Sequence, residues 1–502
     1  MPKNNNNDSP ESTEQIEIVP PIKGSETQAF IIDVSLTHLG RALYPILNPV
    51  LAKMSGLNAF LQGLLAASTV VMTVLAPIPM SHAVSKHGGK KQVLGLLTGA
   101  LVGMTALTTL SAVTDITAIN SFGWEYGVIL GSGLLMGCGP SVYSLILNAL
   151  QWAKKPQHIS IIQSSYGGIA DFAGVLTPIG VLYLGSYGYY IPFAFYTGLL
   201  ACSLPMAFLF IQPPPYLQLY KHVSATRARE LAILHGQLPF MIHDEKEDSM
   251  PTVLRRQFET LFTYQGMVLN FAFFMALGGL LATETILPTL LRNGFNASQT
   301  EAVFIASGAN FVGILARSPT SLLINKIANY TDYIHLLGTS LTATGMGLLA
   351  FDGGSPVSLY GGMLLSGIGN SIAIVTTTNL AITLSEPKNS LLKKYNPNTM
   401  MGLIGVAGTA GGVALPIVSG LMIQANKEEG YKNYFLLIMA LVFFSGFLIC
   451  LLNRVAEHRK GESIFGGSMN FFHRVANRAR NLPLTRHYIF RDNPDNSSAL
   501  KK

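Results

Sequence analysis

The chain has 502 residues, of which 49% are hydrophobic and only 12% are charged, and its mean hydropathy is +0.38. Soluble proteins carry roughly 25% charged residues, so this composition excludes an ordinary soluble domain. The net charge of +7 does not indicate nucleic-acid binding, because the basic residues gather in loops that we predict to be cytoplasmic. The composition predicts an all-α membrane protein.

Hydrophobic segments separated by polar loops follow one another along the chain. A helix needs about 20 mostly apolar residues to cross the hydrocarbon core of a bilayer, and twelve segments approach or exceed this length. Gly and Pro are frequent within them, as is common in membrane helices. The predicted spans lie near 29–51, 59–84, 93–113, 126–150, 159–184, 189–211, 266–291, 301–327, 334–351, 356–384, 399–424 and 433–453.

The polar stretches divide the chain. Residues 1–28 lack the apolar core of a signal peptide and are predicted to be a disordered cytoplasmic tail. A six-helix half at 29–211 and another at 265–453 flank a charged cytoplasmic loop at 212–264. The basic tail 454–502 is either disordered or an amphipathic helix on anionic lipid. Lys and Arg concentrate in alternate loops, so we expect both termini in the cytoplasm and the protein in the inner or plasma membrane.

The two halves share local sequence features. Segments 59–84 and 301–327 end on a small residue followed by a polar-Lys pair, Ser85-Lys86 in one and Asn325-Lys326 in the other. Segments 159–184 and 399–424 are both glycine-rich and contain a proline. Paired segments of this kind are typical of transporters whose site lies between two repeats. We expect packing or gating roles for Gly167, Gly168, Gly174, Gly408, Gly411 and Gly412.

This organisation resembles the major facilitator superfamily. The loop after the second segment in that family reads G-x-x-x-D-R/K-x-G-x-x-R/K. The present chain keeps Lys86, Gly88 and Lys91 but has Ser81 and Ser85 in place of Gly and Asp. The resemblance implies the family's fold of twelve transmembrane helices in two pseudo-symmetric halves of six. It also implies a monomer without a cofactor.

Within that superfamily the chain is most similar to the nitrate/nitrite porter branch. The run 278–289 and the glycine-rich run 401–412 resemble signatures of that branch. Arg317 stands eight residues before the pair 325–326, which is the family's spacing for a substrate arginine. The family's other substrate arginine is missing, because Pro77 occupies the matching position. The resemblance therefore implies an incomplete arginine clamp for a planar anion.

Ionisable residues inside the spans are the candidate site residues, because each is costly at membrane depth. In the first segment, His38, Arg41, Pro45 and Asn48 are separated by 3, 4 and 3 residues. This spacing predicts one helix face that lines a cavity, with Arg41 and His38 binding substrate. The alternative for Arg41 is a structural ion pair with a neighbouring helix.

Further candidates lie in later segments. Arg317 offers a rigid guanidinium fork for an oxyanion, or else it forms a buried ion pair with Glu284 or Asp171. These two carboxylates are proton-coupling candidates; the alternatives are an outer-vestibule position for Glu284 and helix packing for Asp171. Gln163 and Tyr166 precede the glycines of their segment and are expected to contact substrate.

Three classes of function remain. We expect a secondary active transporter of a small polar solute, anionic or zwitterionic, that works by alternating access and couples to protons. The alternative is an exporter of a larger amphiphilic compound such as a drug or siderophore. The sequence has no Walker A motif, no metal-ligand spacing and no catalytic constellation, so we expect neither an enzyme nor a metal site. A sensor role would reside in the charged central loop or the C-terminal tail.

Overall fold

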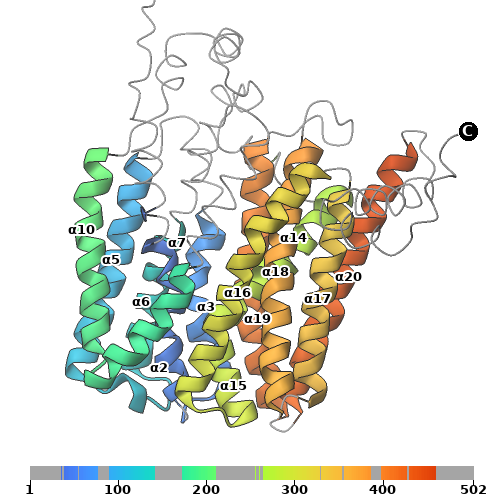
Figure 1. Cartoon of the computed structure of the whole chain (residues 1–502). Coiled ribbons are helices and arrows are strands. Elements are labelled where there is room, and N and C mark those ends of the chain that lie inside the picture. Colours follow the sequence, from blue (N-terminus) through green and yellow to red (C-terminus); the bar gives the residue numbers. More distant parts are fainter. Residues whose placement is uncertain are drawn as a thin grey trace, which may run out of the picture.

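A computed structural model defines a bundle of long helices (Figure 1). No strand occurs within the residues that the structure describes. Those residues are 35–36, 39–54, 56–76, 90–141, 172–210, 255, 259, 264–327, 330–352, 355–385, 397–426 and 429–459.

Eight helices in these ranges are long and apolar enough to cross a membrane. This confirms the prediction of an all-α membrane protein, including the two spans near 334–351 and 356–384, one of which is short and the other interrupted by glycine. The eight helices are α5 (Lys90–Val113), α10 (Tyr190–Phe210), α14 (Tyr264–Thr285), α16 (Gln299–Lys326), α17 (Thr331–Asp352), α18 (Pro356–Ser385), α19 (Pro397–Ala425) and α20 (Gly430–Arg459).

Shorter helical elements complete the bundle, and helical residues occur in all twelve predicted spans. Polar loop residues at 114–123 connect α5 to α6 and include a single 3-10 turn, η2 (Ile116–Ala118). The other short elements are η1 (Tyr44–Leu47), α2 (Asn48–Lys53), α3 (Ala59–Leu75), α6 (Trp124–Met136), α7 (Cys138–Ser141), the helix Phe172–Tyr187, which includes the turn η4 (Gly185–Tyr187), and α15 (Leu287–Phe295).

The first and second halves of the sequence lie side by side. Helices α3, α5, α6 and α10 occupy one side of the bundle, and α14 to α20 occupy the other (Figure 1). Helix α3 packs against α19 across the two halves, whereas α2 packs against α15 and α16. We call the upper end in Figure 1 the Lys90 end, because α5 begins there. The lower end, which carries α2 and α15, is called the Arg292 end.

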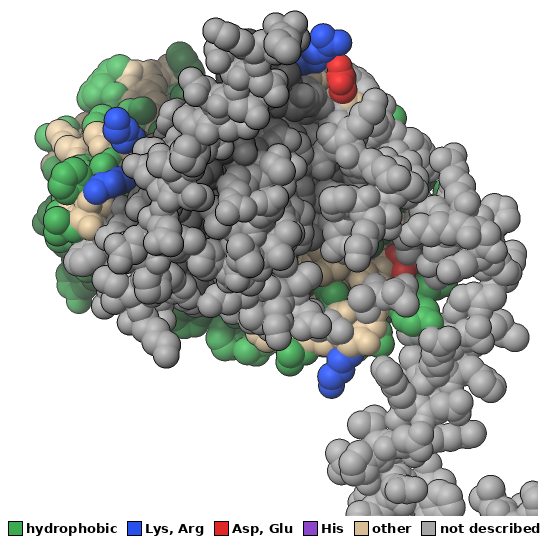
Figure 2. Space-filling view, turned by 90° about the horizontal axis from the view of Figure 1, so that it is seen from above, with side chains coloured by type: hydrophobic (Ala, Val, Ile, Leu, Met, Phe, Trp, Pro, Cys, Tyr) green, Lys and Arg blue, Asp and Glu red, His purple; other side chains and the backbone are tan. Residues whose placement is uncertain are grey.

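The outer surface of the bundle is apolar. Hydrophobic side chains line the left and lower edges of the molecule in the view onto the Lys90 end (Figure 2). Large apolar side chains exposed to this degree indicate contact with lipid rather than water. Strongly exposed examples on the spanning helices include Val102, Phe195, Phe208, Leu315, Leu322, Val357, Phe443, Phe444 and Phe447.

Three predicted spans are broken within the described residues, and one of them is 126–150, in which Gly137 separates α6 from α7. The chain turns at residues 42–43 before η1 and α2, so the prediction of one continuous helix over 29–51 is wrong. Pro45 and Pro49 explain the interruption, because a proline lacks the amide proton and is favoured in the first turn of a new helix. The predicted span 266–291 is also divided, at Ile286, with Pro288 in the first turn of α15.

Glycines set how closely helices approach across the interface of the halves. Gly63 of α3 lies against the Pro416 carbonyl of α19, where a side chain would collide with the backbone. Gly420 of α19 lies against α3 in the same way, since a methyl group there would be 2.6 Å from the Ala59 carbonyl oxygen. Small residues allow such backbone contacts between membrane helices.

A second set of glycines joins α17 to α18. Gly338 contacts Gly369, and Gly345, one heptad further along α17, contacts Gly362, one heptad earlier on α18. A methyl group on Gly362 would lie 2.8 Å from the Gly345 carbonyl oxygen, and one on Gly338 would lie 2.9 Å from the Gly369 carbonyl oxygen. The two antiparallel helices are therefore held backbone to backbone at two levels.

This contact predicts a difference between adjacent glycines. Gly362→Ala should lower the free energy of unfolding by about 1–3 kcal/mol, because the added methyl group overpacks the helix contact. Gly361→Ala is the control, since a methyl group there meets no described atom within 4 Å. Thermal unfolding of the two purified variants measures the difference. Equal unfolding temperatures would show that α17 and α18 tolerate a wider separation.

Candidate solute-binding site

The central polar contact is an ion pair between the halves. Arg41 Nη2 donates to Glu284 Oε1 at 2.8 Å, and these side chains are separated by 243 residues in sequence. Arg41 is 6% exposed and Glu284 only 1% exposed. Glu284 is therefore buried in an ion pair, and its alternative position in an outer vestibule stays a prediction. The hydrogen bond that Glu284 Oε1 accepts comes from Arg41, and the alternative of an ion pair between Arg317 and Glu284 or Asp171 stays a prediction.

The broken first segment positions Arg41. The helical residues 39–41 pack tightly on α7, because Gly40 lies against the Gly139 carbonyl with no room for a side chain. The chain then turns and brings Tyr44 back under the guanidinium, whose carbon lies 4.6 Å from the ring centroid. An aromatic face stabilises a cation at such a distance. The Arg41 side chain is thus held by its own segment as well as by Glu284.

Glu284 is the second-to-last residue of α14, and neighbouring helices determine its position. Gly278, on the same helix, packs backbone to backbone on Gly411 of α19, which brings α14 close to that helix. Gly174 of the helix Phe172–Tyr187 approaches the carboxylate directly. A methyl group on Gly174 would lie 3.0 Å from Glu284 Oε1 and 3.7 Å from Asn310 Nδ2 of α16. Glu284 and Asn310 therefore flank the same position.

Asn310 adds hydrogen-bonding capacity to the ion pair. The side chain is 3% exposed, and its Oδ1 accepts no hydrogen bond from any described residue. Ser307, one turn earlier on α16, is also buried, and its hydroxyl likewise lacks a partner in the described ranges. Buried polar atoms normally have partners, so this face of α16 is suited to a polar ligand.

Arg317 lies on the same face of α16. It follows Asn310 by seven residues, which is two helical turns and about 10 Å along the axis towards the Lys90 end. The side chain is buried. Arg41 and Glu284 neutralise each other at one level of the site, and Arg317 lies about two turns further along α16.

Charge balance constrains what the site can bind. Two opposite charges that leave water together are stabilised by each other, whereas one buried alone is strongly destabilised. The pair presents a guanidinium donor and a carboxylate acceptor at one place. A polar solute with complementary groups can replace those contacts without stranding a charge.

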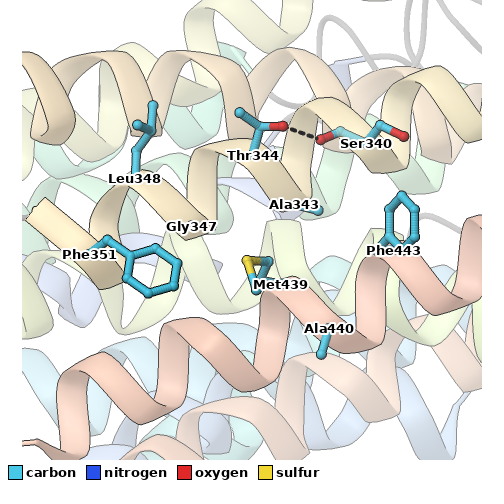
Figure 3. Close-up of a pocket in the computed structure, with 9 residues that line it drawn as sticks. All are labelled: Ser340, Ala343, Thr344, Gly347, Leu348, Phe351, Met439, Ala440 and Phe443. Carbon is cyan, nitrogen blue, oxygen red and sulfur yellow. Dashed lines mark hydrogen bonds between the residues drawn. The ribbon is translucent and has the colours of Figure 1, made fainter.

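The grooves on the outer surface have different chemistry. A groove of about 500 Å³ between α17 and α20 is lined by apolar side chains such as Met439 and Phe443 (Figure 3). Its hydroxyl at Thr344 is already bonded to the Ser340 carbonyl at 2.9 Å. A groove between α5 and α6 is similarly apolar. Neither offers a charged group for a polar solute.

Several predicted site residues contribute local packing. Gly411 and Gly412 of α19 pack against α14. Gly408, also of α19, lies against Phe273 and Leu277 of α14. Lys91 is exposed in the first turn of α5. The remaining predicted residues lie outside the described ones, namely His38, Ser81, Ser85, Lys86, Gly88, Gln163, Tyr166, Gly167, Gly168 and Asp171.

The structure adds residues that the sequence reasoning passed over. Tyr44 is one, because its role depends on a turn that periodicity does not show. Asp332 and His335 are fully buried near the start of α17, and His335 Nδ1 lies 2.9 Å from Thr376 Oγ1 of α18. The sequence did contain a signal for them, because Asp332 and His335 are two ionisable residues three positions apart at the edge of an apolar span. Within the described ranges, no group of three His, Cys, Asp or Glu side chains is arranged to hold a metal ion.

Long apolar helices in two contacting halves, with buried charges between them, define a polytopic membrane protein of the transporter class. The chain belongs to the major facilitator superfamily, because the family model matches residues 34–391. The resemblance to the superfamily is thereby confirmed. The nitrate/nitrite porter branch stays a prediction.

A solved structure supports the same fold. The crystal structure of the human organic anion transporter MFSD10 (TETRAN) aligns with a TM-score of 0.57 over 86% of this chain and 100% of that chain. The two sequences are 16% identical, so the likeness concerns the fold alone. No curated protein matches this sequence.

The ion pair predicts strong non-additivity. Arg41→Met or Glu284→Met alone should lower the free energy of unfolding by about 3–5 kcal/mol, because each leaves an uncompensated buried charge. The double variant should recover most of this loss, since it removes both charges. Thermal unfolding of all four proteins measures the coupling. Additive losses would mean that the two side chains do not stabilise each other.

Proposed function

We propose that this protein is a secondary active transporter that moves a small polar solute, anionic or zwitterionic, by alternating access. The observation that carries the proposal is the buried Arg41–Glu284 pair between the halves, flanked by the unsatisfied carbonyl of Asn310. Arg317, two turns away on the same helix face, provides a second cationic contact along the path. Charged residues at membrane depth commonly mark a solute pathway.

Contacts at the Arg292 end support one closed state of the cycle. Arg292 Nη1 donates to the Ala52 carbonyl at the end of α2. Gln299 Nε2 donates to the Pro49 carbonyl at 2.6 Å and lies 3.3 Å from the Tyr189 hydroxyl. These bonds join α2 to α15 and α16. Alternating access would require them to break when this end opens.

The orientation and coupling belong to the same proposal. We infer from the basic loops that the Lys90 end faces the cytoplasm, with both termini there, and that the protein acts as a monomer in the cell membrane. Proton coupling through Glu284 or Asp171 stays a prediction. The Glu284 carboxylate would become available to a proton whenever a ligand or a change of conformation separates it from Arg41.

The closed end predicts a change in accessibility. Gln299→Ala removes its hydrogen bonds to Pro49 and Tyr189, each worth about 0.5–1.5 kcal/mol, and should favour opening of the Arg292 end. A cysteine at buried Asn48, in a background with Cys138, Cys202 and Cys450 replaced by Ser, should then react several-fold faster with a maleimide.

Exposed Thr300 provides the control for this labelling experiment. Thr300→Ala should leave the labelling rate of the Asn48→Cys protein unchanged, because it leaves the Gln299 contacts in place. An unchanged rate in Gln299→Ala as well would indicate that these contacts do not hold the end closed.

The solute class is tested by ligand-induced stabilisation. A ligand that binds the folded protein at 100 times its Kd stabilises it by about 2.7 kcal/mol. A small anion or zwitterion should raise the unfolding temperature of the wild type. The shift should be lost in Arg317→Ala and retained in Arg255→Ala, whose exposed side chain pairs only locally, with Glu259. Stabilisation by large amphiphiles alone, unchanged in Arg317→Ala, would instead favour the exporter.

A further inference from the structure

The charge arrangement around Glu284 narrows the solute class. We propose that the solute is a small zwitterion, whose carboxylate binds Arg41 and whose ammonium group binds Glu284 and Asn310 Oδ1. This inference rests on the proposed function, because it assigns the ligand of that same site. An α-amino acid is the simplest molecule with both groups on one carbon.

The first argument is the balance of buried charge. The Arg41–Glu284 pair is neutral, so a zwitterion that inserts between the two side chains exchanges one ion pair for two and leaves the total charge at zero. A simple anion would occupy Arg41 but would meet the Glu284 carboxylate, which lies 2.8 Å from the same guanidinium. A simple cation would meet the converse repulsion from Arg41. Burial makes such repulsion strong, because little water screens it.

The second argument is the position of Asn310. Its Oδ1 is a buried acceptor without a described partner, and its side chain flanks the same Gly174 position as Glu284. A carboxamide oxygen and a carboxylate oxygen can both accept from an ammonium group, which has three donors. Oδ1 would gain nothing from a carboxylate, which has no donor to offer. Nδ2 is the Asn310 atom nearest to the Gly174 position, 3.7 Å from a methyl group built there, and the Oδ1 acceptor belongs to the same carboxamide, whereas Arg41 supplies the donor of the site.

The third argument is that the Tyr44 ring holds the Arg41 guanidinium in place. Tyr44 supports the guanidinium on one face, so a ligand that displaces Glu284 finds the arginine already oriented. Gly174 packs closely on the buried carboxylate, since a methyl group there would lie 3.0 Å from Glu284 Oε1 and a larger side chain would collide with it. The site would thus select small solutes that carry both a positive and a negative group.

A competing arrangement also keeps the site neutral. An anion could bind Arg41 while a proton neutralises Glu284. The two arrangements make opposite predictions for Glu284→Gln, which imitates the protonated carboxylate. An anion should bind this variant at least as tightly as the wild type. A zwitterion should bind it at least tenfold more weakly, because its ammonium group has lost its counter-ion.

The experiment measures unfolding temperatures of the purified full-length protein with each of the twenty standard amino acids, with nitrate and with succinate. Each amino acid that stabilises the wild type is then compared with its 2-hydroxy acid and its decarboxylated amine. We expect at least one amino acid to bind, with both analogues at least tenfold weaker. Glu284→Gln should weaken that amino acid at least tenfold, while Glu301→Gln should leave it unchanged, because Glu301 is a half-buried residue in the first turn of α16 that accepts a hydrogen bond from Tyr360 and lies nine residues before Asn310.

The outcomes separate this inference from the broader function. Equal binding of the 2-hydroxy acid, binding of nitrate or succinate without any amino acid, or undiminished amino-acid binding in Glu284→Gln would each overturn the zwitterion and leave a small-anion transporter. Stabilisation only by large amphiphiles would overturn both proposals. If Glu284→Gln does not fold, the comparison of each amino acid with its two analogues on the wild type decides alone.

Discussion

The Arg41–Glu284 ion pair is the constraint on which the rest of the arrangement depends. Two charges at membrane depth are tolerated because each neutralises the other. To meet, they need a first segment that breaks after Arg41 and an α14 that ends just after Glu284. They also need glycines at positions 40, 174 and 278, where neighbouring backbones approach without side chains. The ion pair therefore depends on these breaks and on these close backbone approaches.

The membrane-spanning class was predictable from the sequence, because repeated blocks of about 20 apolar residues match the thickness of a bilayer and are rare in soluble proteins. The breaks were not. Proline in the first turn of a helix is compatible with a new helix, and proline within a helix with a kinked one. Pro45 and Pro288 begin new elements, whereas Pro319 and Pro416 lie inside helices. Hydropathy alone does not distinguish the two cases.

The candidate site was only partly predictable. Arg41, Glu284 and Arg317 stand out in any apolar span because charge is rare there. Which arginine faces the carboxylate depends on a contact across 243 residues, and a single sequence carries no signal for it. Gly174 was expected to pack or gate, yet its position against Glu284 and Asn310 makes it part of the site's wall. Asp332 and His335 were not predicted to be buried, since they adjoin a polar loop, where exposure is the ordinary expectation.

The glycine contacts between α3 and α19 bear on how the halves could move. Gly63 and Gly420 bring the backbones of α3 and α19 together at two neighbouring turns. The contact extends along both helices, because Gly412 lies near Val70 and Thr409 Oγ1 donates to the Thr73 carbonyl at 3.1 Å. The paired glycines of α17 and α18 lie within one half and hold these two helices together at two levels, so we expect the two helices to move as one unit. In the proposed cycle, movement of one half against the other would therefore have to break or shift the α3–α19 contact, whereas the α17–α18 contact within one half would stay intact.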